Sequence, residues 1–325
     1  MLSLVIPVYN NRENLPRLLP ELTTLSARLG SRLEVLFVVD GATDGSLDYL
    51  REHLPTWQVS SRLIELSRNF GSFSAIMAGL EQASGEHIAI LAADLQEPPE
   101  LVVEFQRILS AGEADVVLGV RTGRADPWWS RWLSESFWHL YRWFVVRDMP
   151  RGGVDVFGCT REVRDRLHEL TESHTNLIAL VLWVGFRRAF VPYERQPRLD
   201  GRSGWTFGRK LRYAIDSVFS FTDLPIRALL LLGLAGTAFA LVAGVTVFIM
   251  WALGRIPVLG YTPLMLVITF FGGLTALGFG ITGQYLWLSL QNSRRRPNYI
   301  VKSSVAFAPR SDAASQGRTI DRNSS

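Results

Sequence analysis

One short acidic segment carries residues whose types and spacing suit chemistry. It follows an apolar run at 87–91 and reads Ala92-Ala93-Asp94-Leu95-Gln96-Glu97-Pro98-Pro99-Glu100. The two prolines and Glu100 can begin a helix without help from Asp94, which leaves that carboxylate available for another role. Strands and helices that alternate and end in such a carboxylate loop indicate an enzyme that acts on a phosphorylated, metal-bound substrate.

Three more polar clusters follow apolar runs, at 7–10, 40–44 and 67–71. The runs at 2–6, 33–39, 62–66, 87–91 and 115–120 are predicted strands, and helical patterns lie at about 13–29, 45–53, 72–84 and 98–111. This alternation predicts an α/β fold with a doubly wound, mostly parallel sheet, whose ligands bind at the carboxyl ends of the strands. Ordinary turn chemistry explains each cluster separately, and Asp44 could equally cap the next helix. Four clusters on one rim favour a binding site.

Two long stretches further along the chain, 228–253 and 256–292, contain no charged residue. Each exceeds the roughly 20 residues that cross a bilayer, although a pair of buried core helices is the alternative. They predict a transmembrane hairpin with helices at about 228–252 and 263–289. Basic residues flank the pair and only Arg255 lies between the spans, so both termini should be cytoplasmic and the protein a multi-pass inner (cytoplasmic) membrane protein.

Composition narrows the possible partners. The chain has 325 residues, 48% hydrophobic, and its net charge of +4 is concentrated near the predicted spans, where it would meet anionic membrane lipid. No nucleic-acid-binding module accompanies that charge, so we expect no nucleic-acid partner. The single cysteine, Cys159, excludes a disulfide within the chain.

These patterns predict four regions. Residues 1–206 form a cytoplasmic catalytic domain, within which the aromatic and basic segment 127–147 is predicted to lie at the membrane interface, with core packing as the alternative. Residues 207–225 are predicted to form a juxtamembrane amphipathic helix, and 226–293 the hairpin. The polar, basic tail at 294–325 is predicted to be disordered after about Lys302.

The sequence resembles family 2 glycosyltransferases, specifically polyprenyl-phosphate sugar transferases similar to dolichol-phosphate mannose synthase and the undecaprenyl-phosphate glycosyltransferases. The resemblance covers about residues 1–225 and implies a GT-A (Rossmann-like) fold. The matching stretches are 6–10, 40–46, 67–71, 93–100, 119–121 and 191–195.

The resemblance also implies the residues of a nucleotide site. Pro7, Tyr9 and Asp40 would hold the base and ribose of a UDP- or GDP-sugar, and Asn69 and Gly71 would line the same site.

The resemblance assigns a metal and a catalytic set as well. Asp94 and Gln96 would bind Mg²⁺ or Mn²⁺ on the diphosphate, while Arg121 and Arg131 would receive the acceptor phosphate. Asp94, Arg121 and Arg131 are thus the predicted catalytic residues. Ordinary surface charge is the alternative for both arginines.

Three departures from the family pattern stand out. Ala92 replaces the usual first Asp of Asp-x-Asp, Val39 replaces an Asp that often precedes Asp40, and Asn11 replaces a frequent Glu. The first affects the metal site most. One carboxylate and an amide can still hold Mg²⁺, which keeps several waters and relies on substrate phosphates.

The predicted reaction is inverting transfer of a sugar to a polyprenyl phosphate, with undecaprenyl phosphate favoured, for building or modifying cell-envelope glycans. The acceptor phosphate is already ionised at pH 7, so no general base is required, and positioning and charge screening carry the catalysis. A catalytically degenerate, membrane-bound nucleotide-sugar-binding or scaffold protein is the alternative. Small residues along both spans also leave a homo-oligomer open.

Overall fold

The structure of the chain is a computed structural model. The structure describes residues 1–30, 32–122, 150, 153–170, 177–196, 224–253, 261–293 and 296–309. The predicted interfacial segment at 127–147 and most of the predicted juxtamembrane helix at 207–225 lie outside the described residues.

The described strands form one eight-stranded mixed sheet in the order β7-β5-β6-β4-β1-β2-β3-β8. The strands are β1 (Leu2–Val8), β2 (Leu33–Val39), β3 (Ser60–Leu66), β4 (His87–Ile90), β5 (Val116–Arg121), β6 (Val154–Thr160), β7 (Arg188–Tyr193) and β8 (Val301–Phe307). Strands β4, β1, β2 and β3 are mutually parallel neighbours, as are β5 and β7, whereas β6 and β8 run antiparallel to their neighbours. The predicted mostly parallel α/β sheet is confirmed, with antiparallel β6 and β8 as additions that the sequence did not predict.

Helices cover both faces of the sheet. They are α1 (Leu15–Arg28), α2 (Ser46–His53), α3 (Ser72–Gln82), α4 (Glu100–Ser110), α6 (Arg161–Glu169) and α7 (Leu177–Trp183), with a short 3-10 turn η1 (Leu54–Thr56) after α2. Apolar residues of α1, α2 and α4 pack on one face, and those of α3, α6 and α7 on the other. This two-sided cover explains why the central strands are almost continuously apolar.

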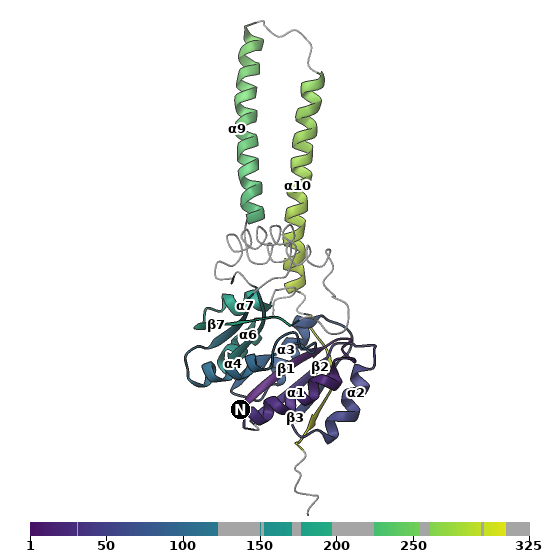
Figure 1. Cartoon of the computed structure of the whole chain (residues 1–325). Coiled ribbons are helices and arrows are strands. Elements are labelled where there is room, and N and C mark those ends of the chain that lie inside the picture. The colour runs from purple at the N-terminus through teal and green to yellow at the C-terminus, as the bar shows by residue number, and fades with distance from the viewer. Residues whose placement is uncertain are drawn as a thin grey trace, which may run out of the picture.

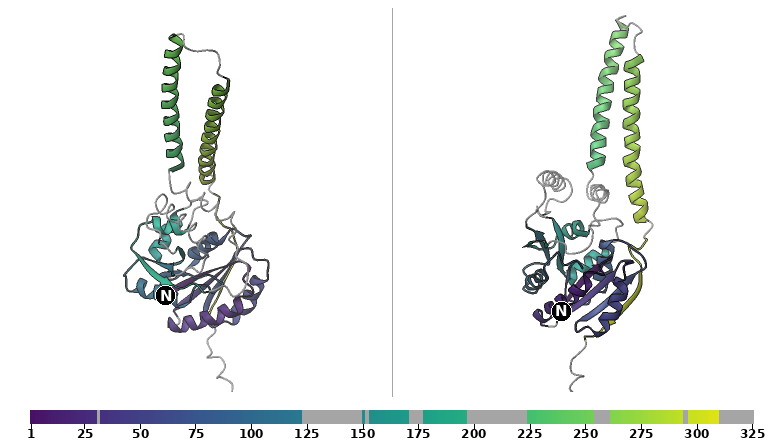
Figure 2. Two further views of the ribbon diagram at one scale, coloured as in Figure 1. Left: turned by 45° about the horizontal axis from the view of Figure 1, so that its top comes forward. Right: turned by 45° about the vertical axis from the view of Figure 1, so that its right-hand side comes forward.

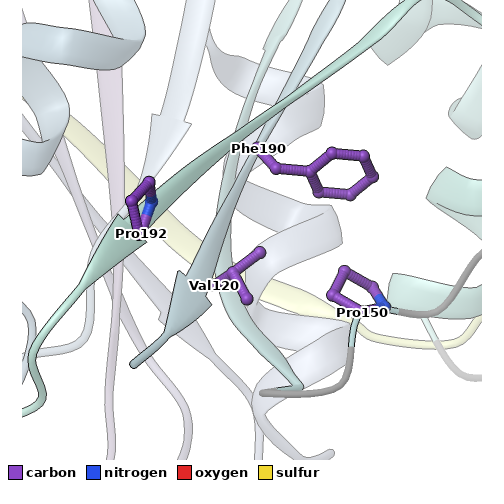
Figure 3. Close-up of a pocket in the computed structure, with 4 residues that line it drawn as sticks. All are labelled: Val120, Pro150, Phe190 and Pro192. Carbon is purple, nitrogen blue, oxygen red and sulfur yellow. The ribbon is translucent and has the colours of Figure 1, made fainter. Parts of the chain in front are cut away.

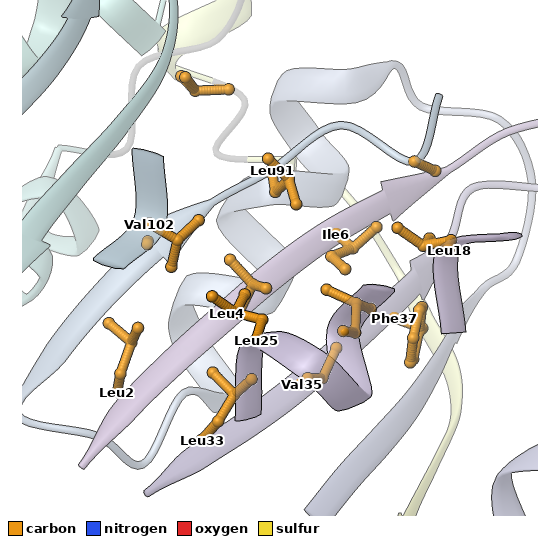
Figure 4. Close-up of a cluster of buried hydrophobic side chains, with 14 of the residues drawn as sticks. Leu2, Leu4, Ile6, Leu18, Leu25, Leu33, Val35, Phe37, Leu91 and Val102 are labelled. Carbon is orange, nitrogen blue, oxygen red and sulfur yellow. The ribbon is translucent and has the colours of Figure 1, made fainter. Parts of the chain in front are cut away.

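Strand β1 shows how the sequence pattern builds the core. Leu2, Leu4 and Ile6 point toward α1 and α4, where Figure 4 shows them among the side chains of neighbouring elements. Val5 points to the opposite face and joins the cluster under α3. Because side chains alternate along a strand, one short apolar run supplies both layers.

Two long helices, α9 (Leu224–Ala252) and α10 (Tyr261–Ser293), extend side by side from one end of the α/β body (Figures 1 and 2). Many of their large apolar side chains are exposed, among them Leu231 and Phe279. Within the described part of the chain, no helix meets the combined length and apolarity of a membrane span. The predicted transmembrane hairpin is therefore not confirmed.

The prediction of a disordered tail from about Lys302 is wrong for its first residues. Strand β8 returns after α10 and pairs antiparallel with β3, from Ser61 opposite Phe307 to Leu66 opposite Val301. Side chains reinforce the pairing, because Glu65 accepts hydrogen bonds from Lys302 Nζ at 2.6 Å and Ser303 Oγ at 3.0 Å. Composition alone suggested disorder, but a seven-residue strand that completes an existing sheet edge needs no core of its own.

Candidate active site

The carboxyl ends of β1, β2 and β3 form one half of a rim, which we call the β1–β3 rim (residues 9–11, 40–45 and 67–71). Asp40 is central to it and only 2% exposed. Its carboxylate accepts hydrogen bonds from the backbone N–H of Phe70 at 2.7 Å and of Gly71 at 2.8 Å. Burial raises the pKa of Asp40, and the two backbone hydrogen bonds partly offset that effect. Asp40 thus fastens the loop after β3 to the end of β2.

Gly41 allows these two loops to approach closely. Its φ is +62°, and a Cβ atom there would lie 2.4 Å from the backbone nitrogen of Asn69. An L residue would therefore meet both backbone strain and a clash with main-chain atoms. The turn at 40–45 is therefore required for the contact between the loops after β2 and β3, independently of any ligand.

Asp44 connects the loop after β1 to α2. It accepts hydrogen bonds from the backbone N–H of Arg12 at 2.8 Å and from both the N–H and the hydroxyl of Ser46, at 3.0 and 2.6 Å. Burial acts to raise the pKa of Asp44, but the hydrogen bonds outweigh it and the pKa is lowered. The expectation of a helix-start role is close to what the structure shows, although the N-cap residue itself is Gly45.

The predicted nucleotide residues fall together on this rim. Pro7 is the second-to-last residue of β1. Tyr9 comes directly after the strand, with 49% of its surface exposed. Asn10 takes a positive φ of 53°, and its side-chain oxygen accepts a hydrogen bond from Thr43 N–H at 2.9 Å. The hydrogen-bonded loops at this rim therefore hold the exposed ring of Tyr9 in place, and such a ring suits stacking against a base.

The ends of β4, β5 and β7 and the start of β6 form the second half, the β4–β7 rim (residues 94–97, 121, 155 and 193–196). Here Gln96 is buried and both ends of its amide are hydrogen-bonded: Oε1 accepts from Arg195 Nη2 at 2.6 Å, and Nε2 donates to Gln196 O at 3.3 Å. The backbone N–H of Gln196 also donates to Gln96 O at 2.9 Å. The loop after β4 and the loop after β7 are thus bonded along one short stretch.

Glu97 is the most buried carboxylate of this rim, with 1% exposure. Its Oε1 lies 3.9 Å from Arg195 Nε, while its Oε2 is buried and has no hydrogen-bond partner among the described residues. Burial, followed by the negative charges of Asp94 and Asp155, raises the pKa of Glu97 to about 7, and Arg195 acts in the opposite direction. These four charged groups therefore lie close enough to influence one another.

Arg121, at the end of β5, faces the same cluster. Its Nε lies 2.8 Å from Asp155 Oδ2, although that N–H has no aligned hydrogen-bond acceptor within the described residues. The hydroxyl of Tyr193 donates to the same Oδ2 at 2.9 Å. Burial raises the pKa of Tyr193, and the charges of Asp155 and Glu97 add to the effect, so this hydroxyl stays a donor. An arginine held by an off-axis ion pair can turn toward a second anion.

The structure thus places Asp94, Gln96 and Arg121 on one rim, as predicted, while Arg131 lies outside the described residues. It adds four residues that the sequence did not assign to the site, namely Glu97, Asp155, Tyr193 and Arg195. Three of these stood in the matching stretches at 93–100 and 191–195, which was the available signal. Asp155 had none, because its antiparallel strand β6 was not predicted.

A divalent metal is implied by the resemblance, and the donor set can be tested against it. No group of three His, Cys, Asp or Glu side chains suited to a metal occurs in the described ranges. Gln96 Oε1 already accepts from Arg195. An amide oxygen has a second lone pair, so the carboxylate of Asp94 with Gln96 Oε1 fits the mode in which Mg²⁺ takes most of its ligands from substrate phosphates and water.

A shallow apolar pocket of about 400 Å³ lies nearby, lined by Val120, Pro150, Phe190 and Pro192 (Figure 3). Side chains alternate along β5 and β7, so Val120 and Pro192 face away from Arg121 and Tyr193. The pocket therefore belongs to the opposite face of the sheet from the charged cluster.

Comparison with known proteins finds relatives that are named as sugar transferases and align with more than nine-tenths of the chain. An uncharacterized glycosyltransferase of Synechocystis, sll0501, is 31% identical over 309 residues, covering 92% of this chain and 94% of the relative. The bactoprenol glucosyl transferase of Shigella phage SfV is 29% identical over 306 residues, covering 93% and 98%. The solved mannosyltransferase PcManGT of Pyrobaculum calidifontis, in complex with GDP-Man and Mn²⁺, is similar at a TM-score of 0.45 and 18% identity, covering 88% of this chain and 87% of that one.

The sequence profile of glycosyl transferase family 2 matches residues 3–166, which is about half of the chain. That range contains every strand from β1 to β6 and most of both rim halves. The α/β sheet is accordingly of the GT-A type, and the protein is a glycosyltransferase. The chain belongs to glycosyl transferase family 2.

Proposed function

We propose that this glycosyltransferase moves a sugar from a nucleotide-sugar, with UDP or GDP as the carrier, to a polyprenyl phosphate such as undecaprenyl phosphate. The observation that supports the proposal most is the β4–β7 rim, where Arg121 and Arg195 lie beside the β1–β3 rim. The carboxylates of the same rim are Asp94, Glu97 and Asp155. Two anions must meet in this reaction, and cations at the meeting point are what it requires. The acceptor class is supported by the phage relative, whose name states a bactoprenol substrate.

The β1–β3 rim binds the nucleoside in this proposal. Tyr9 stacks on the base, and the loop containing Asn69 and Gly71 closes the opposite side. Asp40 acts mainly by holding that loop, since both of its oxygens accept backbone hydrogen bonds.

The reaction follows from what the two phosphates are. An ionised oxygen of the lipid phosphate attacks the anomeric carbon, the new C–O bond forms as the bond to the diphosphate breaks, and the electron pair leaves with the nucleoside diphosphate. Attack opposite the leaving group inverts the anomeric centre. No proton has to be removed from the nucleophile, so the work of the protein is to position the reactants and screen their charge. Arg121 and Arg131 are proposed to receive the acceptor phosphate.

Asp94 is proposed to bind Mg²⁺ or Mn²⁺ together with the donor phosphates. When bound, the ion would supply positive charge to the departing diphosphate. Asp94 is partly exposed on the rim, as a residue that meets a substrate-borne ion must be.

Membrane attachment is also part of the proposal, with residues 1–206 as a cytoplasmic catalytic domain and both termini cytoplasmic at the inner membrane. It rests on the charge-free stretches 228–253 and 256–292 and on the exposed apolar side chains of α9 and α10. Reporter fusions after Ser325 and near Gly260 should report opposite sides of the membrane. Fusions that report the same side would reject the hairpin.

The test of function is direct detection of the lipid product. The full-length protein in detergent or membranes is incubated with undecaprenyl phosphate and a panel of UDP- and GDP-sugars, and the lipid fraction is analysed by mass. We expect one donor to give a lipid phosphate heavier by one sugar residue, with an equal amount of nucleoside diphosphate released. Nucleoside diphosphate release that does not depend on the lipid, with no sugar on it, would contradict the proposal.

A further inference from the structure

Arg195 is held at the β4–β7 rim in an unusual way. It follows β7 and keeps 34% of its side chain exposed. Its firmest described contact is with a neutral group, because Nη2 donates to Gln96 Oε1 at 2.6 Å. The nearest carboxylate oxygen that pairs with it, Glu97 Oε1, is 3.9 Å from Nε, beyond hydrogen-bonding distance. The guanidinium is thus aimed by an amide and, among the described residues, only loosely neutralised.

The loose pairing does not suit a purely structural ion pair. A buried carboxylate is costly unless its oxygens accept hydrogen bonds. Glu97 is buried, yet its Oε2 has no hydrogen-bond partner among the described residues. A structural pair would be expected to close to about 2.8 Å, as Arg187 and Asp115 do at the other end of β7. Glu97 instead stays 3.9 Å from Arg195, so that, among the described residues, the N–H groups that Gln96 does not use are left for another acceptor.

The surroundings indicate what that acceptor is. Asp94 and the Arg195 partner Gln96 belong to one loop, and Gln96 is bonded by its backbone to Gln196, so Arg195 stands directly beside the proposed donor-phosphate site. The position that usually supplies a second acidic residue to this loop holds Ala92. A fork of N–H donors matches two oxygens of a diphosphate, and its charge compensates for weaker metal binding.

We propose that Arg195 binds the diphosphate of the nucleotide-sugar, and that Gln96 and Glu97 are positioning residues that aim its guanidinium there. The inference rests on the proposed function, since it takes the donor to be a nucleoside diphosphate sugar. The arginine is a substrate contact, whereas Gln96 and Glu97 act through it.

The test compares ligands that differ by one phosphate. Binding of UDP, UMP, GDP and GMP to the full-length protein is measured by calorimetry, with Mg²⁺ and separately with EDTA. For the pair that the wild type binds, Arg195→Ala should weaken the diphosphate about ten- to a hundredfold and leave the monophosphate nearly unchanged, because a charge-assisted hydrogen bond is lost. Arg195→Lys should recover only part, since the charge remains without the fork. Glu97→Gln should give a smaller loss in the same direction.

Arg187→Ala is the matched control, because it removes an arginine that pairs with a carboxylate at the far end of β7. It should bind all four nucleotides as the wild type does, and thermal midpoints check that each variant is folded. Unchanged diphosphate binding in Arg195→Ala would overturn the inference while the proposed function stands. Equal losses for diphosphate and monophosphate would also overturn it, because the variant would then have damaged the whole site. A wild type that binds no nucleoside diphosphate would instead overturn the proposed function itself.

Discussion

The two halves of the rim handle their polar groups in opposite ways. On the β1–β3 rim, both oxygens of Asp40 accept backbone hydrogen bonds, and Asp44 is bonded to the neighbouring loop and to Ser46. On the β4–β7 rim, a buried oxygen of Glu97 and the Nε–H of Arg121 have no hydrogen-bond partner in the described part of the chain. One half is satisfied by its own loops, and the other keeps unmet hydrogen-bonding capacity.

This difference indicates that the β1–β3 rim holds the ligand and the β4–β7 rim takes part in the reaction. Buried polar groups that lack partners are costly, so they persist where a ligand or a function compensates. The satisfied half can keep one shape with or without substrate, which suits recognition of a nucleoside. The half with unmet hydrogen-bonding capacity can form new hydrogen bonds when phosphates bind, which suits the step in which charge moves. The two edge strands also differ, because β8 runs antiparallel to β3 and β7 runs parallel to β5.

The largest effect should come from a substitution on the β4–β7 rim. Asp94→Ala should lower transfer by about a hundredfold or more, because it removes the carboxylate that we propose binds the metal. Turnover at saturating donor measures the effect, and thermal unfolding checks the fold. The matched control is Glu100→Ala, in which an exposed carboxylate of the same segment loses only its pair with Arg28. If Asp94→Ala keeps near-normal turnover, the metal role assigned to this half is wrong.

On the β1–β3 rim, a substitution should mainly lower the free energy of unfolding. Asp40→Ala leaves the N–H groups of Phe70 and Gly71 without their acceptor, so we expect a loss of about 2 kcal/mol in the free energy of unfolding. Thermal unfolding of the full chain should show a midpoint lower by several degrees. Asp48→Ala, which removes a highly exposed carboxylate of α2, should leave the midpoint unchanged. Equal midpoints for both variants would show that the hydrogen bonds of Asp40 do not stabilise this rim.

The smallest effect is expected at the sheet edge formed by β8. Glu65→Gln weakens the ion pairs with Lys302 and Arg51, whose cations are more than half exposed, so about 1 kcal/mol or less is expected. Hydrogen exchange of the β8 amides should become faster, while that of β1 should not change. Glu104→Gln, an exposed pair on α4, is the control. Unchanged exchange in β8 would mean that backbone pairing alone holds this strand.

The sequence predicted the two halves unequally for a physical reason. Strands β1 to β5 and the loops after them follow the repeating strand–helix pattern, so Tyr9, Asp40 and Asp94 could be placed on one rim from the order of elements alone. Strand β6 breaks that pattern by running antiparallel, and it brings Asp155 to the rim from its start instead of its end.

Long-range pairing was the other missing information. The bond between Gln96 and Arg195 joins residues 99 positions apart, and β8 reaches β3 across more than 230 residues. No local periodicity encodes such contacts, and a polar composition made β8 look disordered. Glu97 illustrates the limit most clearly, because a charged residue in an acidic loop is expected at the surface, yet it is buried.

The central claim, that the β1–β3 rim binds the nucleoside of the donor and Arg121 of the β4–β7 rim binds the acceptor phosphate, is tested most directly by two titrations on two variants. Donor is titrated at fixed undecaprenyl phosphate, and the lipid at fixed donor, with Tyr9→Ala and Arg121→Ala. We expect Tyr9→Ala to raise the donor KM about tenfold through lost stacking, and Arg121→Ala to raise the acceptor KM about ten- to a hundredfold through a lost charge-assisted hydrogen bond, each with little effect on the other substrate. If both variants weaken the same substrate, or if Arg121→Ala weakens the donor alone, the division of the rim is contradicted.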